Sequence, residues 1–86
     1  MTLPAALQGR ADELQSGPDC LPPLAAAILV ALEAGLASDS RHLCRILGVE
    51  HALLLREIAL LQDRELVAVD RRDPRTLRTH IRPTGG

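Results

Sequence analysis

The chain has 86 residues, of which 47 % are hydrophobic and none is aromatic, and its formal net charge is −1. This length allows one small domain, whose core must consist of aliphatic side chains. Proteins that bind single-stranded nucleic acids stack bases on aromatic rings, so the composition argues against single-stranded partners. The apolar run 24–32 is too short for a membrane span and lacks the flanks of a signal peptide, so we expect a cytoplasmic protein with no membrane partner.

The charges are distributed unevenly along the chain. Residues 1–70 carry five arginines against ten acidic residues, whereas residues 71–86 carry five arginines and one histidine against a single aspartate. On its own the net charge argues against a nucleic-acid partner, but this average hides a basic C-terminal element on an acidic body. Charges that protect exposed strand edges are the alternative explanation, but five arginines within residues 71–82 exceed what edge protection needs.

Residues 3–15 are expected to form an amphipathic helix with Pro4 in its first turn. Three leucines lie within about 40° of one another on its helical wheel. They are Leu3, Leu7 and Leu14. Because an isolated stripe of leucines must be buried against another apolar surface, we predict that this N-terminal arm, residues 1–21, mediates a homodimer. A frayed arm is the alternative.

The main domain is expected over residues 22–86. Two prolines open a helix over 24–34 that is apolar almost all round and should be the most buried one. Residues 38–40 supply an N-cap for a short helix over 41–47. Gly48 then ends that helix, because only glycine takes a left-handed C′ position without a steric penalty.

A longer helix follows from His51 to about Arg64, and two helices joined by such a turn predict a helix-turn-helix. The inward face of this longer helix is expected to carry Leu54, Ile58 and Leu61. Its outer ridge is expected to carry Ala52, Arg56, Ala59 and Asp63.

Two strands complete the domain. We predict a strand over 66–69, a turn over 71–75 containing Pro74, and a strand over 77–82. In the second strand, Leu77, Thr79 and Ile81 alternate with Arg78, His80 and Arg82. The fold class is therefore α+β, mainly α: a winged helix-turn-helix with a three-helix core, a two-stranded β-wing and an extra N-terminal helix.

These motifs resemble the winged-helix transcriptional regulators of the MarR and ArsR kind. Their usual run is a Leu-Gly-Val/Leu-Ser corner, a recognition helix, Gly-Leu-Val and a basic wing. Here Leu47-Gly48-Val49-Glu50 matches the corner, and Leu66-Val67 follows at the expected distance. The resemblance covers roughly residues 24–85. It implies a bacterial regulator of double-stranded DNA whose recognition helix enters the major groove and whose wing contacts the backbone or minor groove.

Carried over to this chain, the recognition helix spans His51 to Arg64 and the wing spans Asp70 to Arg82. Arg56 can bond a guanine edge bidentately, while the wing arginines neutralise phosphates. The predicted DNA-binding residues are Arg41, Arg45, His51, Ala52, Arg56, Arg71, Arg72, Arg75 and Arg78.

Several positions depart from the family pattern. Glu50 stands where serine normally caps the recognition helix, and its carboxylate repels an approaching phosphate. Glu65 replaces the turn glycine, which requires a left-handed residue or a different corner. Leu53 and Leu55 occupy positions that are usually polar in the family. The alternative function is therefore a winged-helix module that binds a protein through the helix face around Ala52 and Ala59.

The sequence gives no indication of an enzyme. It contains no nucleophile–base pair, paired-carboxylate cleft or glycine-rich phosphate loop. Cys20 and Cys44 form neither a disulfide framework nor a zinc motif. We therefore expect no catalytic residue, no metal and no cofactor.

Overall fold

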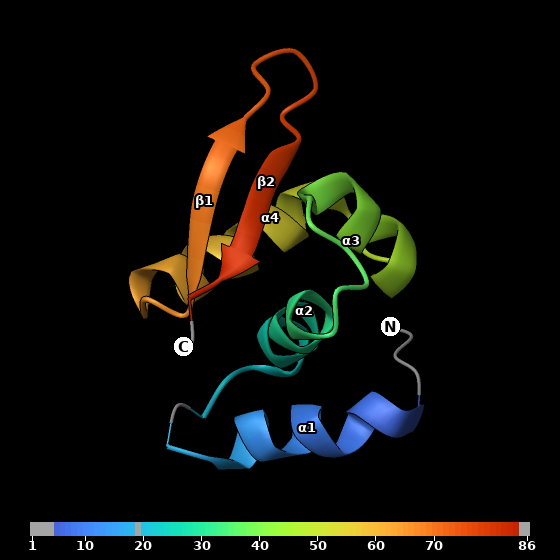
Figure 1. Cartoon of the computed structure of the whole chain (residues 1–86), viewed down its shortest axis with the longest axis vertical. Coiled ribbons are helices and arrows are strands. Elements are labelled where there is room, and N and C mark those ends of the chain that lie inside the picture. The colour runs from blue at the N-terminus through green and yellow to red at the C-terminus, as the bar shows by residue number, and fades with distance from the viewer. Residues whose placement is uncertain (1–4, 19, 85–86) are drawn as a thin grey trace.

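The computed structural model of the chain describes residues 5–18 and 20–84, so the predicted helix start at Leu3 and Pro4 lies outside the described residues. Over these residues the fold is α+β and mainly helical, with four helices and one two-stranded antiparallel sheet (Figure 1). The elements in order are α1 (Ala5–Ser16), α2 (Pro23–Glu33), α3 (Ser40–Leu47), α4 (His51–Asp63), β1 (Val67–Arg72) and β2 (Thr79–Pro83). None of these helices combines the length and the apolar character that crossing a membrane requires.

Helix α2 forms the centre of the core. Its residues 25–32 are all buried, which confirms the prediction that this helix is the most buried one. In Figure 1 it lies between α1 on one side and α3, α4 and the sheet on the other. Alanines at positions 25, 26, 27 and 31 keep its surface narrow, so the neighbouring elements can approach it closely.

Local signals set the ends of the helices as predicted. Asp39 caps α3, because its Oδ1 accepts a hydrogen bond from the backbone N–H of His42 at 2.9 Å. Gly48 ends α3 in the left-handed conformation, with φ +68°, and its N–H bonds the carbonyl of Cys44. Glu65 follows α4 with φ +60°, so of the two alternatives expected at this corner the structure has the left-handed residue.

Helix α1 packs on α2 within the chain. Ala11 and Leu14 are buried, and Leu7 is half-buried against the same core. Arg10 Nε lies 3.2 Å from Glu33 Oε1 and links the two helices at the surface. Homodimerisation through the leucines of this helix stays a prediction, but Leu14 is already covered by the chain itself.

Strands β1 and β2 form a hairpin that contains a β-bulge. Val69 pairs with Ile81 and Arg71 pairs with His80, so Asp70 is an extra residue in β1. The predicted strand ends are wrong here. Strand β1 continues through residue 72, and β2 begins only at residue 79.

The hairpin tip, residues 73–78, differs most from the sequence prediction. Asp73 starts the turn, because its Oδ1 accepts the N–H of Arg75 at 2.8 Å. Leu77 therefore lies in the turn with φ +61° and is 50 % exposed, whereas strand alternation placed it on the face of Thr79 and Ile81, which are both buried. A left-handed leucine costs about 1–2 kcal/mol of backbone energy.

Candidate nucleic-acid interface

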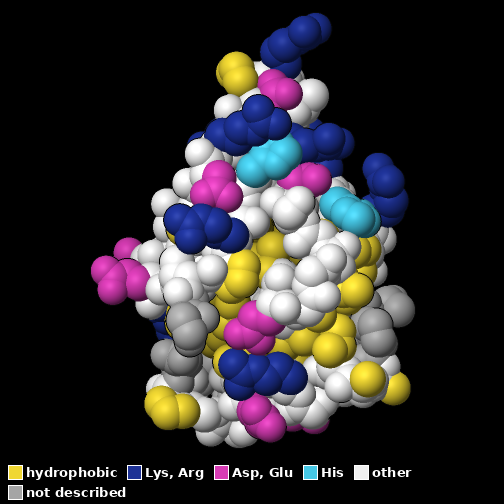
Figure 2. Space-filling model, viewed as in Figure 1, with side chains coloured by type: hydrophobic (Ala, Val, Ile, Leu, Met, Phe, Trp, Pro, Cys, Tyr) yellow, Lys and Arg dark blue, Asp and Glu magenta, His cyan; other side chains and the backbone are white. Residues whose placement is uncertain are grey.

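The positive charge of the chain is concentrated in its second half. Residues 1–37 carry one arginine and four acidic residues, whereas residues 38–86 carry nine arginines and seven acidic residues. Figure 2 shows that arginine and histidine side chains gather over the hairpin and α3, with a few acidic side chains among them. A cationic region of this kind attracts polyanions, and the α1 end of the molecule does not share it.

The outer face of α4 carries apolar and polar residues in equal number. Its predicted inward face, Leu54, Ile58 and Leu61, is buried, and its predicted outer ridge, Ala52, Arg56, Ala59 and Asp63, is exposed, so both predictions are confirmed. Leu53 is 41 % exposed, while Leu55 is half-buried and packs on the core. At the N-terminal end of the helix, Glu50 occupies the N-cap position but its side chain makes no capping hydrogen bond.

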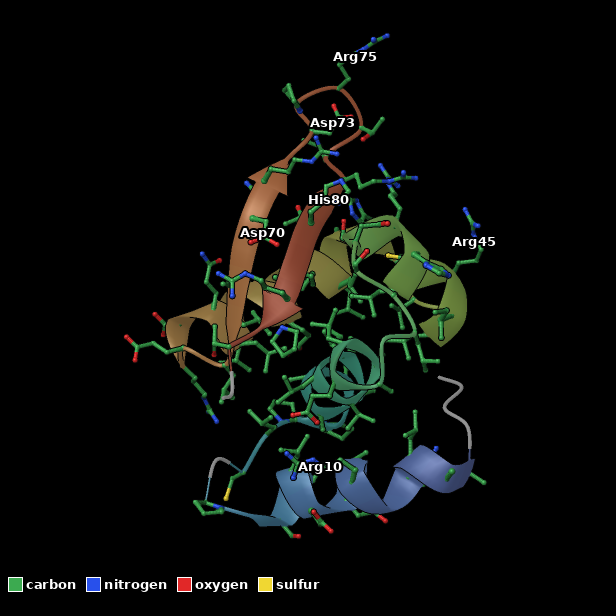
Figure 3. The ribbon with its side chains drawn as sticks, viewed as in Figure 1. Arg10, Arg45, Asp70, Asp73, Arg75 and His80 are labelled. Atoms are coloured by element: carbon green, nitrogen blue, oxygen red, sulfur yellow. The ribbon has the colours of Figure 1, made fainter. Side chains whose placement is uncertain are left out.

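Three of the predicted DNA-binding arginines extend into solvent. Within the described part of the chain, the guanidinium groups of Arg45, Arg56 and Arg75 are exposed and make no hydrogen bond or ion pair. Figure 3 shows Arg45 pointing outward from α3 and Arg75 outward from the hairpin tip, both far from Arg10 on α1. An unpaired exposed guanidinium keeps all its donors available to a phosphate or a base edge.

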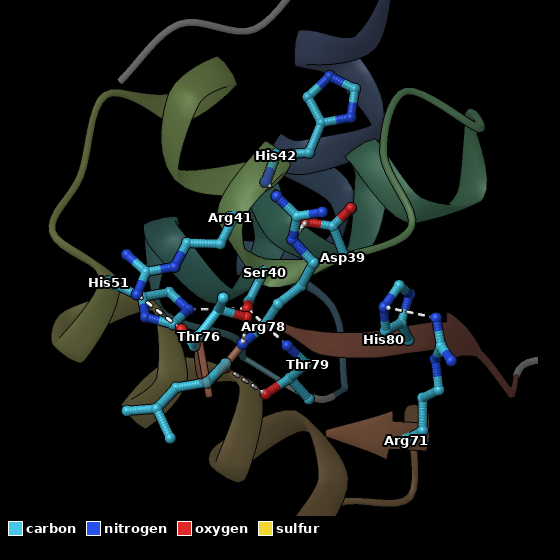
Figure 4. Close-up of polar contacts among 11 residues, drawn as sticks. Asp39, Ser40, Arg41, His42, His51, Arg71, Thr76, Arg78, Thr79 and His80 are labelled. Carbon is cyan, nitrogen blue, oxygen red and sulfur yellow. Dashed lines mark hydrogen bonds and ion pairs between the residues drawn. The ribbon is translucent and has the colours of Figure 1, made fainter. Parts of the chain in front are cut away.

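A buried serine joins α3, α4 and the hairpin (Figure 4). Ser40 Oγ accepts the backbone N–H of Thr79 at 2.9 Å and lies 2.7 Å from His51 Nε2. With the histidine proton on Nδ1, Nε2 accepts the hydroxyl hydrogen of Ser40, which is not used elsewhere. Sequence analysis recognised Ser40 only as part of an N-cap segment, and no local signal marks a bond across 39 residues.

His51 is therefore engaged at this junction. Burial, and then the nearby Arg41 cation, lower its pKa from the ordinary value of 6.5. A neutral imidazole adds no charge to a phosphate site. The predicted contact of His51 with DNA stays a prediction, but its Nε2 is already bonded within the chain.

Two further predicted DNA-binding residues hold the hairpin tip on α3. Arg41 Nη2 donates to the carbonyl of Thr76 at 2.7 Å, and Arg78 Nε lies 3.5 Å from Asp39 Oδ1. Asp39 thus caps α3 and also pairs with an arginine of the tip. Both guanidinium groups remain on exposed residues, so they add to the local positive potential while part of their hydrogen-bonding capacity is used.

Within residues 5–18 and 20–84, the side-chain contacts of the β1 arginines are long. Arg71 Nη2 lies 3.5 Å from His80 Nε2, and Arg72 Nε donates to Thr79 Oγ1 at 3.4 Å. Contacts at the distance limit contribute little and leave these exposed side chains able to reorient. The structure therefore brings four hairpin arginines and Arg41 toward the tip, while Arg45 and Arg56 lie on the two preceding helices. The four are Arg71, Arg72, Arg75 and Arg78.

The surface also contains a cavity of about 360 Å³ between the C-terminal end of α2 and β2. Leu32, His42 and Ile81 line part of it. Among the described residues there is no group of three or more His, Cys, Asp or Glu side chains that could hold a metal ion.

Comparison of the chain with protein-family models, with curated proteins and with solved structures finds no match. A function must therefore be inferred from the positions and contacts of the side chains themselves.

Proposed function

We propose that this chain is a winged-helix protein that binds double-stranded DNA, in which α3 and α4 form the helix-turn-helix and the hairpin forms the wing. The observation that carries the proposal is that Arg45, Arg56 and Arg75, on three successive parts of this unit, are exposed and have guanidinium groups without a partner among the described residues. Arginine donates to phosphate oxygens bidentately, and phosphate contacts dominate the affinity of proteins for duplex DNA.

The positions of these arginines suit different contacts with DNA. Arg56 lies on the exposed ridge of α4, the helix that would enter the major groove. Arg45 and Arg75 would bind phosphates on either side, with Arg71 and Arg72 adding positive potential. The biological role that this proposal implies is that of a bacterial transcriptional regulator of the MarR and ArsR kind.

The exposed face of α4 limits how sequence can be read. Arg56 and Gln62 are exposed residues on this helix that carry hydrogen-bond donors, whereas Ala52 and Leu53 can only make apolar contacts, for example with thymine methyl groups. We therefore propose that phosphate contacts supply most of the affinity for DNA. A guanine contact by Arg56 would then supply most of the discrimination between DNA sequences.

The test is fluorescence anisotropy of a labelled random-sequence duplex titrated with the protein over a range of salt concentrations. The wild-type protein should bind at low salt and weaken steeply as salt rises. Arg45→Ala and Arg75→Ala should each weaken binding and lower the magnitude of the salt slope by about 1, because each removes one phosphate contact. Arg56→Ala should in addition relax base preference in a selection from a random pool.

The matched control is Arg10→Ala. It removes the same charge from α1, far from the proposed interface, and should leave the salt slope unchanged. Equal effects of Arg10→Ala and Arg75→Ala would show that binding depends only on net charge. Absence of binding by the wild-type protein at low salt would contradict the proposal outright.

A second candidate function is docking on another protein through α4. The 41 % exposure of Leu53, next to the exposed Ala52, favours it, since large apolar side chains on a surface often mark interaction sites. This candidate would be preferred if the wild-type protein failed to bind duplex DNA at low salt.

A further inference from the structure

We propose that Leu77 is an apolar wedge that contacts the minor groove of duplex DNA when the protein binds. This inference rests on the proposed function and adds to it a named apolar contact at the hairpin tip. It comes from the hairpin tip, where the structure departs most from the alternation expected of a strand.

Leu77 is exposed in a conformation that does not suit it. The residue is 50 % exposed, and Leu53 and Leu77 are the exposed large hydrophobic residues of the described chain. Its φ of +61° is one that glycine adopts without strain. Because the position would accommodate glycine better, neither core packing nor turn geometry explains a leucine here, and strain of this kind is often associated with a functional site.

The hairpin tip holds Leu77 in a fixed position. Its N–H donates to the carbonyl of Asp73 at 2.8 Å, and the N–H of Asp73 donates to the carbonyl of Arg78 at 2.9 Å. The carbonyl of Thr76, the preceding residue, accepts the bond from Arg41 on α3 at 2.7 Å. The leucine therefore lies in a turn that is closed across its base and anchored to a helix. Because the turn is already ordered, little conformational entropy would be lost on binding.

The charges around Leu77 favour a polyanionic partner. Arg75 and Arg78 lie two residues before and one residue after it, and Arg72 and Arg41 lie at the base of the tip. An apolar protein surface would not compensate for the desolvation of so many cations, whereas the two phosphate backbones that border a DNA groove would.

The shape of the tip favours the minor groove. That groove is only about 6 Å wide, which suits one side chain at a turn better than a helix. Leucine is among the side chains that proteins insert there, and arginines are attracted to its negative potential. The geometry thus assigns to Leu77 the apolar contact and to the neighbouring arginines the flanking phosphates.

The test compares two labelled duplexes that differ in the minor groove alone. One contains guanine, and the other has inosine in its place, which removes the exocyclic amino group from the minor groove and leaves the major-groove pattern unchanged. The wild-type protein should bind the inosine duplex more tightly, since that groove is less obstructed. Leu77→Gly should lose this preference and bind about tenfold more weakly, with an unchanged salt slope because no charge is removed.

Two further variants keep the test decisive. Leu77→Met retains an apolar side chain and should retain both the affinity and the preference for inosine. Leu77→Asn tolerates the left-handed conformation but is polar, so it should behave like Leu77→Gly while keeping a side chain at this position. Thermal unfolding of each variant provides the folding control.

The outcomes separate this inference from the proposed function. If the wild-type protein binds neither duplex, the proposed function fails and this inference fails with it. If the wild-type protein binds but Leu77→Gly and Leu77→Asn bind equally well, the wedge is overturned and DNA binding stands. If the variants weaken binding without a change in the inosine preference, Leu77 contacts something other than the minor groove, which also overturns the inference.

Discussion

Ser40 Oγ and His51 Nε2 lie 2.7 Å apart and join the first residue of α3 to the first residue of α4. The same oxygen accepts the backbone N–H of Thr79 at the start of β2. One hydroxyl group therefore fixes the positions of the two helices and the hairpin relative to one another. The arrangement of the proposed DNA-binding surface depends on this junction as much as on any of its arginines.

Replacing Ser40 with alanine should destabilise the protein by about 1–3 kcal/mol. The change leaves the buried N–H of Thr79 without its acceptor and His51 without its partner. The free energy of unfolding can be measured with chemical denaturant and far-ultraviolet circular dichroism, because the chain has no aromatic fluorophore. Ser38→Ala, at an exposed position, is the control and should have little effect. Equal stabilities of the two variants would contradict the assigned role.

Stability should fall as the pH is lowered below about 6.5. The pKa of His51 is lowered in the folded protein, so in this range the unfolded chain binds a proton that the folded chain does not bind. The contribution of the neutral histidine is complete above the unfolded pKa and is lost as the pH falls from there toward the folded pKa. NMR titration of the ring protons should give a pKa below 6.5, and His51→Gln should remove this part of the pH dependence.

Asp39→Asn should increase the affinity for duplex DNA at low salt by a few-fold. Asparagine caps a helix about as well as aspartate, so the stability should change by less than about 1 kcal/mol. The substitution removes a carboxylate beside Arg78 and frees that guanidinium for a phosphate, which should steepen the salt slope by up to about 1. Asp12→Asn makes the same charge change on exposed α1. If both variants bind equally, the ion pair does not restrain Arg78.

Left-handed residues allow a paired test of backbone strain. Gly48→Ala should destabilise the protein by roughly 1 kcal/mol, since a Cβ at that position meets no atom within 4 Å and the cost is conformational alone. Glu65→Gly, at φ +60°, should stabilise it by up to about 1 kcal/mol for the converse reason. Thermal unfolding of both variants checks the two signs. A stabilising Gly48→Ala change would mean that the turn between α3 and α4 adopts another conformation.

Most of the helical part of the fold could be predicted from the sequence because its signals are local. Asp39 and Gly48 bound α3 through contacts three or four residues away, and the spacing of Leu54, Ile58 and Leu61 shows which face of α4 is buried. Such signals need no knowledge of the rest of the chain. The apolar core followed directly from them.

The hairpin and the junction could not be predicted in the same way. Strand alternation predicted that Leu77 points inward. In the structure the turn begins at Asp73, whose side chain accepts the N–H of Arg75, and Leu77 is part of that turn. The bonds of Ser40, Arg41 and Arg78 to groups 35 to 39 residues away exist only because β2 returns to the start of α3. Sequence identifies these side chains as charged or polar, but not which of them are already bonded within the chain.

The bulge in β1 has a consequence for the length of the hairpin. Asp70 has no partner in the register of the sheet, since Val69 pairs with Ile81 and the next pair is Arg71 with His80. Deleting Asp70 would therefore leave every remaining pair aligned, reduce the local twist and release Arg82 from its 2.9 Å ion pair. The chain thus carries one residue here that strand pairing does not require, and β1 can be shortened at this position without changing which residues of the two strands pair.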